Sequence, residues 1–236
     1  MDKKEKNLKK MLEIDFVGKE LLNNSIFDTT MENVAKENNI YNKEKKYGSI
    51  IIITGEKELL EKVEKEIEKM KVGEEKIVFL NEKEGFGERK GDYVRILPLK
   101  VFQEQKINPV PGLIINTGNM LGKVQSVSGG RVRVDFNHPL AGRKLEYKIK
   151  LIKEIKNIKE KAEKIFEKYY SQIPNAKKEI KENILYITLS SSEIKGLEKI
   201  NNSIKELSEK LGVKINFVES KDVKNKEKTI VDKNKK

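Results

Sequence analysis

The sequence predicts an α+β protein built from two or three compact units. Near the N-terminus, apolar residues alternate over short runs as in half-buried strands. Between residues 58 and 70 they recur at three- and four-residue steps, as on one face of a helix. A stretch rich in glycine and proline follows, and helical and strand patterns return after residue 154. A chain of 236 residues is too long for one small domain.

The first unit combines short strands with two helices. Four consecutive isoleucines within residues 49–54 predict a buried strand, because β-branched side chains suit strands and the run is too short for a helix. Thr29 or Thr30 is the expected N-cap of the first helix, since a threonine hydroxyl can accept a hydrogen bond from the first turn. The expected order is strand 11–17, strand 25–28, helix 29–39, strand 49–54, helix 58–70 and strand 76–80.

A small β-rich module is expected at residues 89–135. Three of the five prolines fall there, and Ser128-Gly129-Gly130 separates its last two apolar runs as a hairpin turn. The next strand, at residues 144–152, must pair with the N-terminal strands, because residues 11–88 lack a closing strand of their own. The module therefore interrupts the first unit instead of following it.

Residues 154–220 are expected to form a second α+β unit. The expected order is helix 154–170, strands 177–182 and 184–190, helix 192–211 and strand 213–218, with Gly212 as the glycine that ends a helix. The second helix carries an apolar stripe that is expected to pack on the unit's own sheet, so it does not prove a partner and a homodimer through this unit stays open. The stripe is Ile194, Leu197, Ile200, Ile204, Leu207 and Leu211.

The composition excludes several kinds of site. Cysteine is absent and His138 is the only histidine, which excludes disulfides, thiolate metal sites and histidine clusters. No EF-hand spacing occurs, so neither a metal nor another cofactor is expected. No run of 18 apolar residues occurs and the N-terminus has no signal-peptide pattern, so a cytoplasmic protein without membrane association is expected.

The net charge of +12 is concentrated at the two ends of the chain. Residues 221–236 contribute +4 and residues 1–10 contribute +3, whereas lysine and glutamate are interspersed elsewhere. This distribution disfavours a dedicated nucleic-acid surface. A weak electrostatic association with ribosomes through the Lys-rich termini stays open.

Five short motifs resemble those of FKBP-type peptidyl-prolyl cis-trans isomerases, in the family's order and over residues 14–152. The first two are Phe16-Val17-Gly18-Lys19 and Ile26-Phe27-Asp28-Thr29-Thr30. The others are Met70-Lys71-Val72-Gly73-Glu74-Glu75, Gly85-Phe86-Gly87-Glu88-Arg89 and Asn137-His138-Pro139-Leu140-Ala141-Gly142 followed by Leu145. The insertion before the fifth motif is similar to the insert-in-flap chaperone domain of the SlyD-like subgroup. The extension at residues 29–47 and the appended domain resemble that subgroup's long archaeal members.

The resemblance implies an FKBP-like antiparallel β-sheet wrapped on a helix, with an inserted domain, a C-terminal α+β domain and a Lys-rich disordered tail. Their expected bounds are 1–88 with 136–153, then 89–135, 154–220 and 221–236. The implied function is that of a peptidyl-prolyl isomerase and folding chaperone for unfolded or nascent polypeptides that contain X-Pro bonds. The tail lacks the His and Cys residues of nickel-binding SlyD tails, so nickel is not carried over.

The resemblance also implies how the site would work. Rotation about an X-Pro bond has a barrier of roughly 18–20 kcal/mol, and the twisted amide is less charge-separated than the planar one, so a dry aromatic pocket favours it. Leu60 would donate its N–H to a substrate carbonyl, Asp28 would polarise the substrate amide, and Leu140 would close the flap side. By motif position, the pocket would be lined by Phe16, Phe27, Asp28, Leu59, Leu60, Val63, Phe86 and Tyr147.

Several pocket positions depart from the family's pattern. Phe16 stands where the family usually has a tyrosine whose hydroxyl reaches the aspartate. Val63 replaces an aromatic floor, and Lys62 and Glu82 replace a loop glycine and a flap proline. The hypothesis that follows is an isomerase activity that is reduced or absent.

Several of the motif residues also have a purely structural interpretation. Phe16, Phe27 and Phe86 could simply belong to a core. Asp28 could cap a helix or fix a turn, and His138 is expected to fix a turn by hydrogen bonding and not to act as an acid or base.

The insert carries more apolar residues than a core of its size needs. They form either a surface for unfolded chains or a small β core with exposed remainders, and Met120 in a Gly-rich loop suits an adaptable contact. The candidate client-binding residues are Leu97, Val101, Phe102, Leu113, Ile115, Met120 and Leu121.

Three functions follow from these alternatives. The first is an isomerase with a chaperone insert. The second is a non-catalytic holdase whose FKBP pocket is vestigial. The third is a ribosome- or RNA-associated factor that uses the Lys-rich termini.

Overall fold

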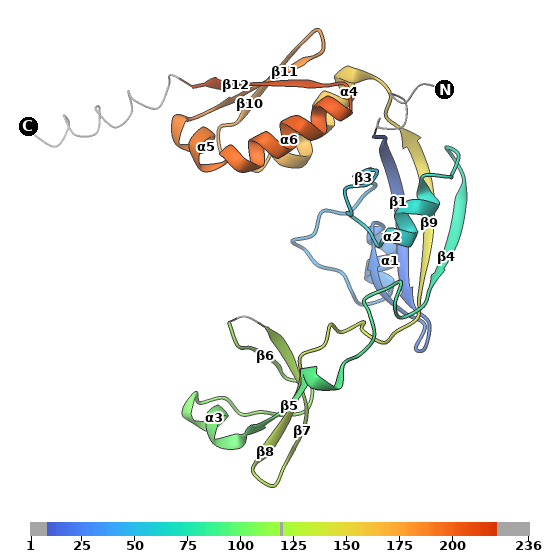
Figure 1. The fold of residues 1–236 in the computed structure, drawn as a ribbon. Coiled ribbons are helices and arrows are strands. Elements are labelled where there is room, and N and C mark those ends of the chain that lie inside the picture. The colour runs from blue at the N-terminus through green and yellow to red at the C-terminus, as the bar shows by residue number, and fades with distance from the viewer. Residues whose placement is uncertain (1–8, 119, 221–236) are drawn as a thin grey trace, which may run out of the picture.

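The chain forms a mixed α+β structure with three separate β-sheets (Figure 1). The computed structural model describes residues 9–118 and 120–220, so the Lys-rich ends considered above lie largely outside the described residues. Among the helices of the described residues, none is long and apolar enough to cross a bilayer.

The first sheet joins residues from both sides of the insertion. Its strand order is β2-β1-β9-β4, with β3 also pairing with β1, and every pairing is antiparallel. The predicted pairing of residues 144–152 with the N-terminal strands is therefore confirmed, because β9 lies between β1 and β4. The elements are β1 (Met11–Glu20), β2 (Ser25–Thr29), α1 (Glu32–Glu37), β3 (Ile50–Ile53), α2 (Glu61–Ile67), β4 (Glu75–Leu80) and β9 (Leu145–Glu154).

Two local predictions for this unit are wrong. Neither Thr29 nor Thr30 caps α1, because their hydroxyls are used by β1: Thr29 Oγ1 donates to the Phe16 carbonyl at 2.9 Å, and Thr30 Oγ1 accepts from the Phe16 N–H at 3.0 Å. The helix expected from residue 58 begins only at Glu61, because Leu60 has extended backbone angles. Both differences concern the segments that carry candidate site residues.

The second sheet belongs to the insertion. Its order is β5-β8-β7-β6, and Gly129 and Gly130 both have positive φ between β7 and β8, as a two-residue hairpin turn requires. The apolar run at residues 93–102 is divided, because the chain leaves the strand at Pro98 and enters a helix that was not expected. The elements are η2 (Gly91–Tyr93), β5 (Val94–Pro98), α3 (Leu99–Glu104), β6 (Ile114–Asn116), β7 (Leu121–Ser128) and β8 (Arg131–Asp135).

The third sheet, β10-β11-β12, combines an antiparallel and a parallel pairing. The prediction of a single helix at residues 192–211 is wrong. The structure has two helices there, α5 and α6, because Leu197 has non-helical backbone angles between them. Gly212 has a φ of +82° directly after α6, as predicted for a helix-ending glycine. The elements are α4 (Ile158–Tyr169), β10 (Lys177–Lys181), β11 (Ile184–Leu189), α5 (Ser191–Gly196), α6 (Glu198–Lys210) and β12 (Lys214–Glu219).

Four of the six residues of the apolar stripe pack in the hydrophobic cluster of their own unit, whereas Leu197 is half-buried outside that cluster and Ile200 is exposed. Ile204, Leu207 and Leu211 are buried and Ile194 packs beside them. The same cluster also contains Met11 and Ile53 from the first sheet. The third unit, which is built on the third sheet and spans residues 154–220, therefore shares one hydrophobic core with the start of the first unit.

Candidate active site

Four aromatic side chains converge in the hydrophobic cluster that the first sheet forms with α2. Phe16 on β1 and Tyr147 on β9 have ring centroids 5.8 Å apart. Phe27 on β2 meets the ring of Tyr147 at 5.7 Å and that of Phe86 at 6.4 Å, both edge to face. The structure thus brings together the aromatic residues that the sequence motifs single out, from three strands and one loop.

Gly18 makes room for this cluster. It pairs with Asp28 on one side and with Tyr147 on the other, next to a register irregularity in β1. A Cβ atom at this position would lie 2.7 Å from Cζ of Phe27. Glycine is therefore needed here for the Phe27 ring to lie against the strand, a requirement that the sequence did not reveal.

The floor and edge of the cluster come from α2 and the loop before it. Val63 is fully buried beneath the aromatic rings, and Leu59 and Leu60 pack beside it. Within the described residues, the Leu59 N–H is bound by Glu64 Oε1 at 3.1 Å, whereas no acceptor lies in range of the Leu60 N–H. The backbone donor at Leu60 is therefore available to a carbonyl of a bound chain.

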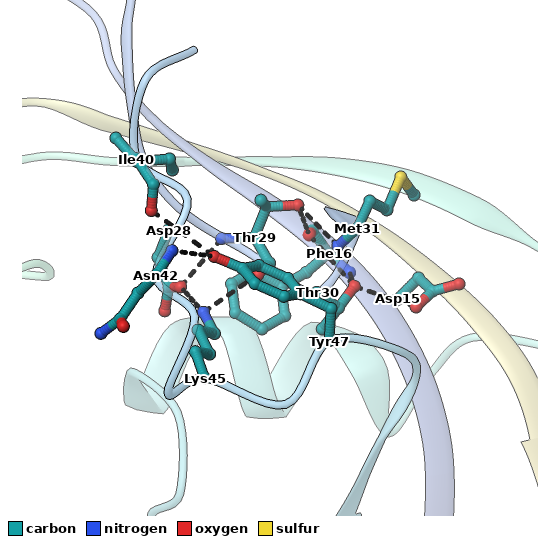
Figure 2. A network of polar contacts seen from close by, with 10 residues as sticks. All are labelled: Asp15, Phe16, Asp28, Thr29, Thr30, Met31, Ile40, Asn42, Lys45 and Tyr47. Carbon is teal, nitrogen blue, oxygen red and sulfur yellow. Dashed lines mark hydrogen bonds and ion pairs between the residues drawn. The ribbon is translucent and has the colours of Figure 1, made fainter. Parts of the chain in front are cut away.

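Asp28 is held by a lysine that the sequence analysis did not single out (Figure 2). Its Oδ1 accepts from the Thr29 N–H at 2.8 Å and forms an ion pair with Lys45 Nζ. The same ammonium donates to the Thr29 carbonyl at 3.0 Å. Phe16 lacks a hydroxyl with which to hold Asp28, and Lys45 holds the carboxylate instead.

The segment that carries Lys45 has a defined structure. The rings of Tyr41 and Tyr47 stack with centroids 5.4 Å apart, and Lys45 Nζ lies 5.4 Å from the Tyr47 centroid. Tyr47 Oη accepts from the Asn42 N–H at 3.0 Å (Figure 2). The Gly48 N–H donates to the Thr30 carbonyl at 2.8 Å. These contacts fix the position of Lys45 beside Asp28, although no local sequence signal distinguishes it among the lysines around it.

The interior of the site is apolar and keeps its tyrosine neutral. Burial, and to a lesser extent the Asp28 carboxylate, raise the pKa of Tyr147 to about 12. In the part of the chain that the structure describes, no three carboxylate or imidazole side chains gather to hold a metal ion. The arrangement can bind an apolar ring and orient a peptide, but it offers no activated nucleophile.

The flap side of the site is closed by the fifth motif. The Leu140 N–H donates to His138 Nδ1 at 3.2 Å, so His138 fixes the turn as expected. Its ring also stacks on Phe86, with centroids 4.2 Å apart. Leu140 itself packs against the cluster of the first sheet.

The client-binding candidates of the insert differ in how far they are buried. The prediction that Phe102 and Ile115 lie on the surface is wrong, because both are buried with Val124, Val132 and Val134 in the core of the insert. Leu97 and Leu113 pack partly against that core, Met120 is half-buried, and Val101 and Leu121 are exposed. Ile114, another of the apolar residues of the insert, alternates with Ile115 and is exposed.

Comparison with known proteins gives three matches. Residues 95–140 match the family model described as FKBP26, IF domain. A protein of Methanocaldococcus jannaschii named short-type peptidyl-prolyl cis-trans isomerase is 37% identical over 126 residues, which cover 53% of this chain and 80% of that protein. A protein of Pseudomonas fluorescens, named as a probable FKBP-type 16 kDa peptidyl-prolyl cis-trans isomerase, is 28% identical over 85 residues, 35% of this chain and 57% of that protein.

Proposed function

The chain belongs to the FKBP-type peptidyl-prolyl cis-trans isomerase family, and from this premise we propose that it catalyses X-Pro rotation at the aromatic cluster described above. The observation that carries the proposal is the convergence of Phe27, Phe86 and Tyr147 beside the free Leu60 N–H. A proline ring would enter among the aromatic rings, and the Leu60 N–H would hold a neighbouring substrate carbonyl.

Catalysis in this site needs no covalent step. Rotation breaks amide resonance, so the twisted amide carries less separated charge and is favoured by an apolar surround relative to water. Asp28 lies at the rim as a carboxylate oriented by Lys45, where it can act on the amide through its charge. Tyr147 stays neutral and keeps the interior free of a second charge.

The proposal includes a chaperone role for the insert, of the SlyD-like kind. Exposed apolar side chains on the insert support this role, because the hydrophobic core of the insert does not use them and they stay accessible to a client. They are Ile96, Val101, Val110, Ile114 and Leu121. The proposed clients are unfolded or nascent polypeptides in the cytoplasm, with a weak ribosome association through the Lys-rich termini and homodimerisation through the third unit as further proposals.

The second candidate function is a holdase without catalysis. It is favoured by Val63, because a valine leaves a smaller floor than an aromatic side chain and weakens contact with a proline ring. In this alternative the insert binds clients and the first unit serves as a scaffold.

An isomerisation assay on a short X-Pro peptide separates the two functions. Phe86→Ala removes the ring that contacts both Phe27 and His138, so the rate should fall toward the uncatalysed one. Phe79→Ala is the matched control, since Phe79 is 57% exposed on β4 and contributes no ring to the cluster. A wild-type rate equal to background would refute the catalytic function, and suppression of client aggregation would then test the holdase.

A further inference from the structure

A groove lies between the sheet of the insert and the two segments that connect it to the first unit. Its cavity volume is about 680 Å³. Ile114 and Leu121 provide its apolar surface and are 57% and 65% exposed. The connecting segments contribute Arg89 and Arg143.

The charge of the groove lining is unbalanced. Three cationic side chains line it, namely Arg89, Lys123 and Arg143, against the single carboxylate of Asp135. That carboxylate is already occupied: it pairs with Arg89, and its Oδ1 accepts from Asn137 N at 2.9 Å and Nδ2 at 2.7 Å. Among the described residues, neither Lys123 nor Arg143 has a carboxylate within ion-pair distance. Two cations are therefore free to meet an anion that enters the groove.

The paired strands β6 and β7 supply one wall of the groove. Gly122 lines it, and a Cβ atom there would lie 2.6 Å from side-chain atoms of both Phe136 and Val134. The Phe136 ring and Val134 therefore occupy the place of a side chain at Gly122, which is buried and pairs with Ile115 across β6 and β7. No phenylalanine, tyrosine or tryptophan lines the groove, and one face of the His138 ring is stacked on Phe86, so the lining is poor in the aromatic platforms on which nucleic-acid bases stack.

The groove also leads to the aromatic cluster. His138 lines the groove, and its ring stacks on Phe86 of the cluster at 4.2 Å. One side chain thus separates the two sites, and a polypeptide bound in the groove is held next to the position proposed for proline.

We propose that this groove binds an extended client segment in which an acidic side chain lies among apolar ones, and that Lys123 and Arg143 select the acidic residue. The proposal rests on the client-binding part of the proposed function and names the substrate class. The apolar surface supplies most of the affinity, while the exposed Lys123 and the half-buried Arg143 set the preference and its dependence on salt.

Three fluorescent peptides of one apolar sequence, with glutamate, glutamine or lysine at the central positions, test the proposal by fluorescence anisotropy with the full chain. We expect the glutamate peptide to bind about two- to tenfold more tightly than the glutamine peptide, and the lysine peptide to bind most weakly. The preference should shrink in 0.5 M NaCl, since the ion pairs are exposed.

The double variant Lys123→Glu and Arg143→Glu should invert the ranking of the glutamate and lysine peptides. Lys100→Glu, on the exposed face of α3 and outside the groove, is the matched control and should leave the ranking unchanged. Circular dichroism checks that the variants fold. If they do not fold, binding of the three peptides to the wild type at low salt and in 0.5 M NaCl tests the selection of acidic clients.

In the peptide experiments, two outcomes overturn the selection of acidic clients: equal binding of the three peptides by the wild type, or an unchanged ranking in the folded double variant. Binding of none of the peptides refutes the client-binding function itself, which is a different result. Displacement of the glutamate peptide by a single-stranded RNA oligonucleotide at lower concentration than by unlabelled peptide would assign the groove to nucleic acid and also overturn the proposal.

Discussion

Replacing Gly18 by alanine tests how closely the aromatic cluster is fitted to β1. The added Cβ atom would lie 2.7 Å and 2.9 Å from two ring carbons of Phe27, well inside van der Waals contact. Gly18 does not have a positive φ, so the backbone tolerates alanine and the ring must move instead. Overpacking of this kind costs about 1–3 kcal/mol of the free energy of unfolding.

The displaced ring should also slow isomerisation. A shift approaching 1 Å in a positioning group can cost up to about 100-fold in rate, and we expect kcat/KM on an X-Pro peptide to fall at least about tenfold. Gly91→Ala is the matched control, because nothing lies within 4 Å of a Cβ atom there. Adding Phe27→Leu to the Gly18→Ala variant removes the clashing ring atoms and should restore stability but not activity.

The result that would refute this reasoning is a Gly18→Ala variant with the stability and kcat/KM of the wild type. That outcome would mean that the Phe27 ring does not rest on β1 in solution. A variant that loses stability but keeps kcat/KM would instead show that Phe27 takes no part in the reaction.

Three further predictions concern the same site. Val63→Phe should raise the rate on a proline tetrapeptide by supplying an aromatic floor, although overpacking a fully buried position costs about 1–3 kcal/mol of stability; an unchanged rate rejects the hypothesis. Lys45→Met should lower kcat/KM about two- to fivefold at low salt, since the Asp28 pair is exposed, and Lys45→Arg should retain the wild-type value; equal rates for both variants contradict this role. Tyr147 has a pKa of about 12 in the folded chain against about 10 when unfolded, so the stability that it contributes below pH 10 should be lost between about pH 10 and 12. Denaturant unfolding at pH 9, 10.5 and 11.5 should show a smaller decline for Tyr147→Phe, and an identical decline would contradict the shift.

Turn chemistry and the number of strands expected on each side of the insert predicted two features of the fold. The glycine pair at residues 129–130 marked its hairpin, and the lack of a closing strand before the insert predicted that residues 144–152 return to the first sheet. The division of the last long helix at Leu197 was missed, because the apolar spacing continues through the break.

The candidate site was predictable in its apolar part only. The motif residues Phe16, Phe27, Phe86 and Tyr147 do meet in space. The Lys45–Asp28 pair was not predictable, because it joins residues 17 positions apart and lysines are frequent throughout the surrounding loop. The burial of Phe102 and Ile115 likewise depends on which face of the insert is covered, a property of its tertiary packing.

The core shared by the first and third units has a consequence for how the molecule unfolds. Met11 and Ile53 of the first sheet are buried in one cluster with Ile165 and Phe166 of α4, and Lys168 Nζ reaches back to the Ile51 carbonyl at 2.7 Å. The insert, by contrast, has a core of its own. We therefore expect the three sheets to unfold as two cooperative units. The insert can open locally, while the first and third units melt together.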